Sequence, residues 1–181
     1  VSGIENVPSE GRVILASNHK SNIDPFCIAA AMRRQVHFLA KEELFRNPVL
    51  GWLMRKWGTI KVRRGAADRK AIAAAIETLR QGHVLGVFVE GTRRRDIQGI
   101  GDLRTGAAML SHYAQAPIVP VAIWRDGKRM HVSFGPPISI DNEGPTGETL
   151  SRKDIYSRTN DALANALNAL LRTPHAESAT H

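Results

Sequence analysis

Strands that alternate with helices predict an α/β fold for this sequence, as a single domain with a largely parallel central sheet flanked by helices. The segment Val84–Val89 is apolar almost throughout, which is typical of a parallel strand covered on both faces. The segment Asp68–Gln81 carries apolar residues at helical spacing, and Gly82 follows it as a favoured helix end. Because 43% of the 181 residues are hydrophobic, the chain can bury one substantial core.

Apolar runs and helical patterns follow one another along the whole chain. The runs expected to form strands are Arg12–Ser17, Val36–Ala40, Thr59–Arg63, Val84–Val89, Pro117–Trp124 and Met130–Phe134. The segments expected to form helices are Pro25–Arg33, Pro48–Trp57, Asp68–Gln81, Arg104–Ala114 and Asp154–Leu171. Proline stands at the start of two of these helices, where it is favoured. No linker divides the chain, so we expect one domain over residues 1–172 and a flexible tail over residues 173–181.

The chain is strongly basic, with a formal net charge of +8. Such a charge suits an anionic partner, which is a nucleic acid, an anionic bilayer or a phosphorylated substrate. Aromatic residues make up only 6% of the sequence, and it has no RNA-binding aromatic motif, basic heptad region or metal-finger spacing. Nucleic-acid binding therefore rests on charge alone, and no nucleic acid is expected.

A single cysteine, Cys27, excludes an internal disulfide framework and the usual zinc spacings. Cys27 lies in an apolar segment and is interpreted as a packed small hydrophobe rather than a catalytic thiol. No stretch reaches the roughly 18 apolar residues that a membrane-spanning helix needs. The sequence begins at Val1, and strand-like sequence follows soon after. One expectation is therefore that the sequence is a fragment from which an N-terminal anchor is missing.

A histidine and an aspartate, His19 and Asp24, lie five positions apart directly after the first expected strand. Histidine is the usual general base near neutral pH, and a neighbouring carboxylate fixes its tautomer and stabilises the imidazolium. Because no Ser or Cys nucleophile motif lies nearby, the pair is better suited to activating a substrate hydroxyl. The alternative is that Asp24 caps a helix starting at Pro25 and that His19 is an ordinary loop residue.

A second polar segment, Glu90–Arg95, directly follows the apolar strand Val84–Val89. Glycine at position 91 lets the backbone approach a ligand closely, and arginine supplies a planar fork that matches phosphate oxygens. Loops at the carboxyl ends of strands are where α/β sheets usually bind ligands. The alternative is a solvated basic turn, and the spacing matches no nucleotide-binding loop.

Four segments together resemble the glycerolipid acyltransferases, the family typified by 1-acylglycerol-3-phosphate (lysophosphatidic acid) acyltransferase. Asn18–Asp24 resembles their N-H-x-x-x-x-D motif, and Phe88–Arg93 resembles their F-P-E-G-T-R motif. Phe38–Leu44, followed by Gly58–Arg64, resembles the segment between these two motifs. Ala116–Ala122 resembles the fourth motif. All four occur in the order of the family and at similar separations, over most of the chain.

The resemblance implies an acyltransferase domain in which His19 is the general base and Asp24 holds and polarises it. The acyl donor would be acyl-CoA or acyl carrier protein, with no metal or organic cofactor. The residues implied to bind the phosphate and glycerol of the acceptor are Glu90, Gly91, Thr92, Arg93, Lys41 and Arg64. Pro120 would shape the acyl or acceptor pocket. The product would be phosphatidic acid, made from lysophosphatidic acid in phospholipid biosynthesis.

Some positions depart from the family pattern and leave other acceptors open. Val89 stands where proline is usual, Arg94 where serine is common, and Arg63 where an acidic residue is common. These changes make the pocket more cationic, so glycerol-3-phosphate, another lysophospholipid or a glycolipid are alternative acceptors. A non-catalytic module that binds anionic lipid is a further alternative, although binding alone needs no general base.

The segment Pro48–Trp57 combines aromatic and aliphatic residues with Arg55 and Lys56. This composition is typical of a helix at the surface of an anionic membrane, with Trp52 and Trp57 as contacts. The alternative is a core helix with two exposed basic residues. We expect a peripheral protein at the cytoplasmic face of the cell membrane.

Overall fold

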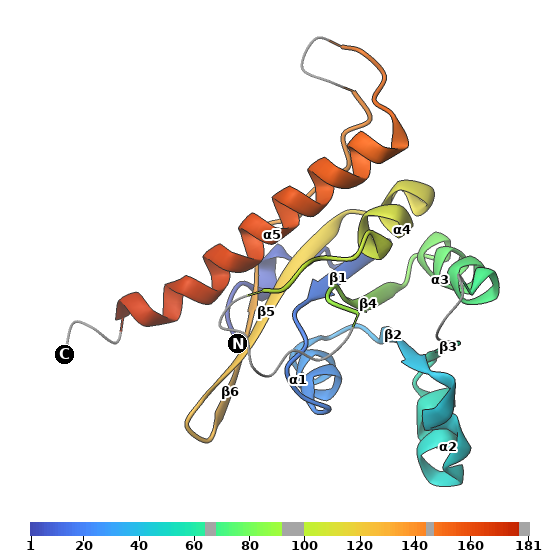
Figure 1. Cartoon of the computed structure of the whole chain (residues 1–181). Coiled ribbons are helices and arrows are strands. Elements are labelled where there is room, and N and C mark those ends of the chain that lie inside the picture. Colours follow the sequence, from blue (N-terminus) through green and yellow to red (C-terminus); the bar gives the residue numbers. More distant parts are fainter. Residues whose placement is uncertain (64–67, 92–99, 144–146, 178–181) are drawn as a thin grey trace.

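A six-stranded sheet in the order β3-β2-β4-β1-β5-β6 forms the centre of the molecule (Figure 1). The computed structural model describes residues 1–63, 68–91, 100–143 and 147–177. The strands are β1 (Val13–Ser17), β2 (Val36–Lys41), β3 (Ile60–Val62), β4 (Val84–Phe88), β5 (Ile118–Asp126) and β6 (Arg129–Phe134). The first five are parallel to their neighbours, and β6 returns antiparallel to β5. The predicted α/β class with a largely parallel sheet is confirmed.

Helices connect the parallel strands, as the alternating pattern predicted. The helices are α1 (Asp24–Ala31), α2 (Pro48–Lys56), α3 (Arg69–Arg80), α4 (Gly106–Ala114) and α5 (Arg152–Glu177). Two short 3₁₀ helices, η1 (Ile4–Asn6) and η2 (Glu42–Arg46), were not foreseen. Helix α5 runs into the segment expected to be a tail. Fully buried Leu163 and Leu167 hold α5 on the sheet, and the helix extends to Glu177, whereas residues 178–181 of the expected tail lie outside the described residues.

The two faces of the sheet are covered unequally. One face of β1, with Ile14 and Ala16, packs against residues of α3, α4 and α5. The other face, with Val13 and Leu15, packs against α1 through Ile28. Successive side chains of a strand point to opposite faces, so β1 is buried on both sides, as its apolar sequence requires.

The ends of β1 and β4 determine where the polar motifs meet. These strands are parallel neighbours, and Ser17 at the end of β1 pairs with Phe88 at the end of β4. The loop after β1 and the turn after β4 therefore leave the sheet side by side at its carboxyl edge. Helix α2 packs against η2 and projects away from the sheet (Figure 1).

Candidate active site

His19 and Asp24 form the centre of the candidate site. His19 Nδ1 lies 3.0 Å from Asp24 Oδ2. The side chain of Asp24 is fully buried, whereas that of His19 is 18% exposed. Because Nδ1 faces a carboxylate, the neutral ring holds its proton on Nδ1 and donates it to Asp24. Nε2 then has a free lone pair, which is the form that a general base needs.

The loop around Asp24 is folded so that it supplies further donors to the same carboxylate. The backbone N–H groups of Lys20 and Ser21 both donate to Asp24 Oδ2 at 2.7 Å. No side chain caps the start of α1, so Asp24 turns back into the loop instead of capping its own helix. A carboxylate in this position stays buried because these donors and the imidazole compensate for its lost hydration. The helix-cap alternative is therefore not what the structure shows.

A stack of rings holds the other side of the imidazole. Phe88 at the end of β4 stacks on His19, with ring centroids 3.9 Å apart. Phe38 on β2 in turn stacks on Phe88 at 5.8 Å. A Cβ at Gly86 would lie 2.3 Å from the Phe38 ring, so only glycine at this position of β4 leaves room for it. The strands thus restrict the imidazole to one plane, next to Asp24.

Glu90 connects the turn after β4 to the histidine. It is 3% exposed, and its Oε1 accepts a long hydrogen bond of 3.4 Å from the backbone N–H of His19. Within the described ranges, Glu90 Oε2 and Asp24 Oδ1 are buried and have no hydrogen-bond partner. Two buried carboxylates beside one imidazole give this corner of the sheet a strongly polar interior, which a fold maintains only at a cost.

Asn18 anchors the loop to the opposite neighbour of β1. Its side-chain amide donates to the carbonyl oxygen of Ile123 on β5 and accepts from the N–H of Ile123, both at 2.8 Å. Asn18 is fully buried. The amide thus replaces a pair of strand hydrogen bonds where β1 has ended, and it fixes the backbone next to His19. We name the set Asn18, His19, Asp24, Phe88 and Glu90 the catalytic corner, after the role proposed for it below.

Arg104 brings a positive charge to the same edge of the sheet. Its backbone N–H donates to the carbonyl oxygen of Val89 at 2.9 Å. Its side chain lies across Gly91, where an added Cβ would lie 2.5 Å from Arg104 Cδ and Nε. Gly91 has a φ of 65°, a left-handed conformation that glycine adopts most readily. The glycine of the motif therefore makes room for a guanidinium that the sequence alone did not single out.

Comparison with known proteins assigns the chain to a family. Residues 1–124 match the sequence profile of the family described as Acyltransferase. The chain belongs to the Acyltransferase family. It is 30% identical over 120 residues to a 1-acyl-sn-glycerol-3-phosphate acyltransferase of Bacillus subtilis, covering 65% of this chain and 58% of that protein. It is 33% identical over 129 residues to one of Borreliella burgdorferi, covering 68% of this chain and 50% of that protein.

Among solved structures, this Acyltransferase-family chain is similar to a crystal structure of the 1-acyl-sn-glycerophosphate (LPA) acyltransferase PlsC from Thermotoga maritima. The TM-score is 0.65 with 24% sequence identity, over 91% of this chain and 70% of that one. At this identity the likeness shows the fold alone. The chain spans about half the length of the curated relatives it matches.

The other site residues predicted from the sequence lie in different parts of this Acyltransferase-family fold, and some lie outside the described residues. Lys41 ends β2, at the same edge of the sheet as the catalytic corner. Pro120 is buried within β5, where its side chain faces Gly135. Trp52 and Trp57 lie on and directly after α2, and both are exposed. Thr92, Arg93 and Arg64, together with Arg94 and Arg95, lie outside the described residues.

Arg63, which departs from the family pattern, takes part in an electrostatic interaction at this edge of the sheet. Arg63 Nε donates to Glu42 Oε2 at 2.8 Å, and Lys61 Nζ lies 3.6 Å from Glu42 Oε1. Glu42 directly follows Lys41, so its carboxylate balances two of the neighbouring cations. The basic character expected from Arg63 is therefore partly neutralised within the protein.

Cys27 on α1 is no candidate nucleophile. Burial, and to a smaller extent the negative charge of Asp24, raise the pKa of its thiol above the ordinary value. A thiol with a raised pKa stays protonated at neutral pH and is a poor nucleophile. Over the described ranges, no three or more His, Cys, Asp or Glu side chains gather to hold a metal ion. No described helix is long and apolar enough to cross a bilayer.

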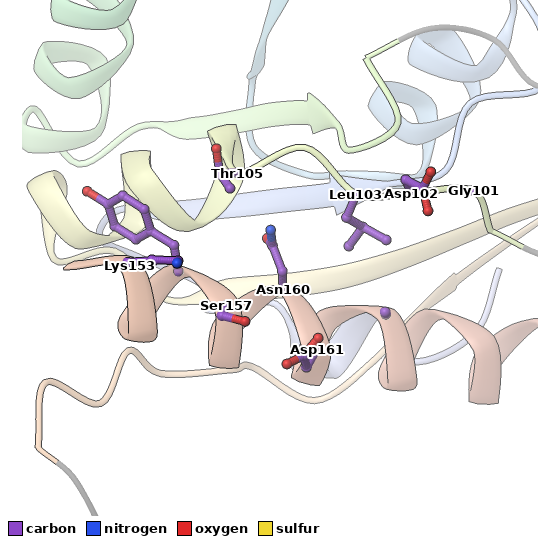
Figure 2. Close-up of a pocket in the computed structure, with 10 residues that line it drawn as sticks. Gly101, Asp102, Leu103, Thr105, Lys153, Ser157, Asn160 and Asp161 are labelled. Carbon is purple, nitrogen blue, oxygen red and sulfur yellow. The ribbon is translucent and has the colours of Figure 1, made fainter. Parts of the chain in front are cut away.

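An open cleft of about 530 Å³ lies elsewhere, between α5 and the segment before α4. Figure 2 shows Ser157, Asn160 and Asp161 of α5 across from Leu103 and Thr105. No residue of the catalytic corner lines this cleft. The candidate site is therefore identified from the hydrogen bonds and buried charges of the corner and not from the cleft.

Proposed function

We propose that this protein transfers a fatty acyl group from acyl-CoA or acyl carrier protein to the free hydroxyl of 1-acylglycerol-3-phosphate, giving phosphatidic acid. The observation that carries the proposal is the 3.0 Å contact between His19 Nδ1 and the fully buried Asp24 carboxylate. Membership of the Acyltransferase family and the names of the relatives support the same reaction. A lipid-binding module would not need a buried carboxylate aimed at an imidazole.

In the proposed step, His19 Nε2 removes the proton of the acceptor hydroxyl as its oxygen attacks the thioester carbonyl carbon. The imidazolium that forms is stabilised by Asp24, which accepts the Nδ1 proton in a hydrogen bond throughout. The new ester C–O bond forms, the C–S bond breaks, and the thiolate leaves with the bonding electrons. The proton held on Nε2 passes to the departing thiolate, so His19 returns to its neutral form.

The acceptor's phosphate would lie against the turn after β4. Gly91 lets the backbone approach the ligand, and Arg104 adds a guanidinium beside it. Lys41 lies at the same edge, and Thr92, Arg93 and Arg64 complete the proposed set. Glu90 would meet the hydroxyl-bearing glycerol, because a carboxylate repels phosphate.

The reaction joins a water-soluble donor to a lipid acceptor. We therefore place the protein at the cytoplasmic face of the membrane, as a peripheral protein of phospholipid biosynthesis. The proposal needs no metal or organic cofactor, since the proton transfer uses only His19 and Asp24. Pro120 is buried near the end of the β1–β5 pairing. It would shape the pocket by positioning β5 and would not contact the reacting atoms.

Thiol release from palmitoyl-CoA tests the proposal. The purified protein is mixed with palmitoyl-CoA alone, with lysophosphatidic acid, with glycerol-3-phosphate or with another lysophospholipid, and the lipid product is identified by mass spectrometry. We expect release that depends on lysophosphatidic acid, and phosphatidic acid as the product. Release with a different acceptor would keep the chemistry and change the substrate. No acceptor-dependent release from acyl-CoA or acyl carrier protein would contradict acyltransfer.

A further inference from the structure

Large apolar side chains are exposed along α2 and at the start of α1. Their exposed fractions run from 39% for Phe26 to 74% for Val49. We name this set the α1–α2 patch, and its members are Ile23, Phe26, Val49, Trp52 and Trp57. Apolar residues of this size are usually buried. A single exposed one is common, but a group of exposed apolar residues marks an interaction surface.

Members of the α1–α2 patch lie side by side in two groups. The rings of Phe26 on α1 and Trp57 after α2 meet edge to face, with centroids 5.2 Å apart. Val49, Trp52 and Lys56 are spaced by three and four residues, so they share one side of α2. Figure 1 shows α2 projecting from the body of the protein, on the side where α1 lies.

Cations border the patch. Arg46, Arg55 and Lys56 are exposed, and the ammonium of Lys56 lies 5.0 Å from the centre of the Trp52 ring. Helix α2 contains no acidic residue. Aromatic rings with adjacent Lys and Arg match the interface of an anionic bilayer, where the rings enter the headgroup region and the cations meet phosphates. A second copy of the chain fits less well, because it would bring Arg55 and Lys56 against like charges.

The patch also adjoins the catalytic corner. Ile23 directly precedes Asp24, and Phe26 follows it within the first turn of α1. We propose that the α1–α2 patch docks the protein on an anionic phospholipid bilayer, with Trp52 and Trp57 in the interface and Arg55 and Lys56 on lipid phosphates. The inference deepens the proposed function and rests on it in one respect, because a lipid acceptor must reach His19 from a bilayer.

Flotation with vesicles tests docking without any need for catalysis. Vesicles of phosphatidylcholine alone are compared with vesicles of equal parts phosphatidylcholine and phosphatidylglycerol. We expect binding to the anionic vesicles. Trp52→Ala/Trp57→Ala should weaken this binding at least about tenfold. Arg55→Gln/Lys56→Gln should weaken it about tenfold to thirtyfold on anionic vesicles, since each interfacial cation contributes about 1 kcal/mol.

The matched control is Lys153→Gln/Arg158→Gln, which removes two exposed charges from α5 on the opposite face of the sheet. We expect this variant to bind vesicles like the wild type. Circular dichroism and thermal unfolding check that each variant is folded. Equal loss in the control and in Arg55→Gln/Lys56→Gln would show binding by net charge alone and overturn the proposal.

Two further outcomes separate this inference from the proposed function. Vesicle binding that is unchanged in both patch variants would overturn the docking surface, even if acyl transfer to a dispersed short-chain lysophosphatidic acid is intact. Docking that depends on the patch, without acyl transfer to that soluble acceptor, would support the surface and contradict the reaction. A dimer that light scattering detects and that Trp52→Ala/Trp57→Ala dissociates, without vesicle binding, would assign the patch to a second copy.

Discussion

The catalytic corner and the α1–α2 patch depart from the usual distribution of residues in opposite directions. In the corner, Asn18, Asp24 and Glu90 are polar and at most 3% exposed. In the patch, Val49 and Trp52 are apolar and more than half exposed. Charged groups are rarely buried and large apolar groups are rarely exposed together, so each arrangement costs stability.

The two regions compensate for that cost in stability in different ways. Asn18, His19 and Asp24 Oδ2 find donors or acceptors within the protein, so this part of the corner is preorganised before any ligand arrives, whereas Asp24 Oδ1 and Glu90 Oε2 have no hydrogen-bond partner among the described residues. Within the described residues, the rings of the patch are contacted by one another at Phe26 and Trp57 and by the Lys56 ammonium at Trp52, and each ring is still at least 39% exposed. Its exposed area is released from water only by something outside the chain. This difference supports our proposals that the corner carries out the chemistry and that the patch binds a partner.

Asp24→Asn should produce the largest change. The side-chain amide keeps the shape of Asp24 but removes its charge. Because Asp24 Oδ2 also accepts from the N–H groups of Lys20 and Ser21, the amide oxygen takes that place, and the imidazolium formed at His19 loses the carboxylate that stabilises it. We expect kcat to fall by about 10³–10⁴-fold, with the fold retained. Steady-state thiol release and circular dichroism measure the two properties. A kcat within tenfold of the wild type would show that the charge of Asp24 does not stabilise the imidazolium.

Asn18→Ala tests whether the corner depends on its anchor. The substitution leaves the N–H and carbonyl of Ile123 without their partner, in a fully buried place. We expect a loss of about 3 kcal/mol in the free energy of unfolding, together with a lower kcat. Urea denaturation measures the first quantity. Asn22→Ala in the same loop, where the side chain is exposed, is the control and should change neither.

Arg104→Gln tests whether a positive charge at the edge of the catalytic corner binds the acceptor. Arg104 is exposed and lies across Gly91, so its loss should weaken binding of an anionic acceptor without disturbing His19. We expect the KM for lysophosphatidic acid to rise about tenfold with little change in kcat, which corresponds to about 1.4 kcal/mol. Lys128→Gln in the exposed β5–β6 turn serves as the charge control. A KM equal to that of the wild type would remove Arg104 from the phosphate site.

Cys27→Ala should produce the smallest effect. The residue lies on α1, between the two regions, and its raised pKa keeps the thiol protonated. We expect activity and vesicle binding to stay close to wild type and the stability to fall by about 1 kcal/mol from lost packing. Acyltransfer assays at neutral pH, together with thermal unfolding, check this expectation. Loss of acyl transfer in a folded variant would point to a covalent thiol intermediate instead of direct transfer.

Local patterns in the sequence predicted much of this structure. The apolar runs identified the strands, and their alternation with helices predicted parallel neighbours, so the loops after β1 and β4 were expected at one edge. The His19–Asp24 contact was also predictable, because its members are five positions apart. The same local pattern left the helix-cap alternative open, since only the folded loop shows which groups donate to Asp24.

Long-range contacts account for what the sequence did not reveal. Asn18 meets Ile123, which lies 105 positions away. The position of Arg104 depends on a backbone hydrogen bond to Val89, and no local pattern distinguishes it from other basic residues. The exposure of Trp52 depends on where α2 packs, so composition could not separate a core helix from a surface one. The sequence included Asn18 only as the first residue of the N-H-x-x-x-x-D resemblance, which does not reveal its contact with Ile123.

The most direct test of the account is the thiol release of His19→Ala beside that of His83→Ala, an exposed histidine at the opposite edge of the sheet. Both proteins are assayed with palmitoyl-CoA and lysophosphatidic acid. We expect His19→Ala to lose about 10²–10⁴-fold in acceptor-dependent rate, and His83→Ala to keep the rate of the wild type. A folded His19→Ala protein that still transfers acyl groups at the wild-type rate would contradict the assignment of His19 as the general base.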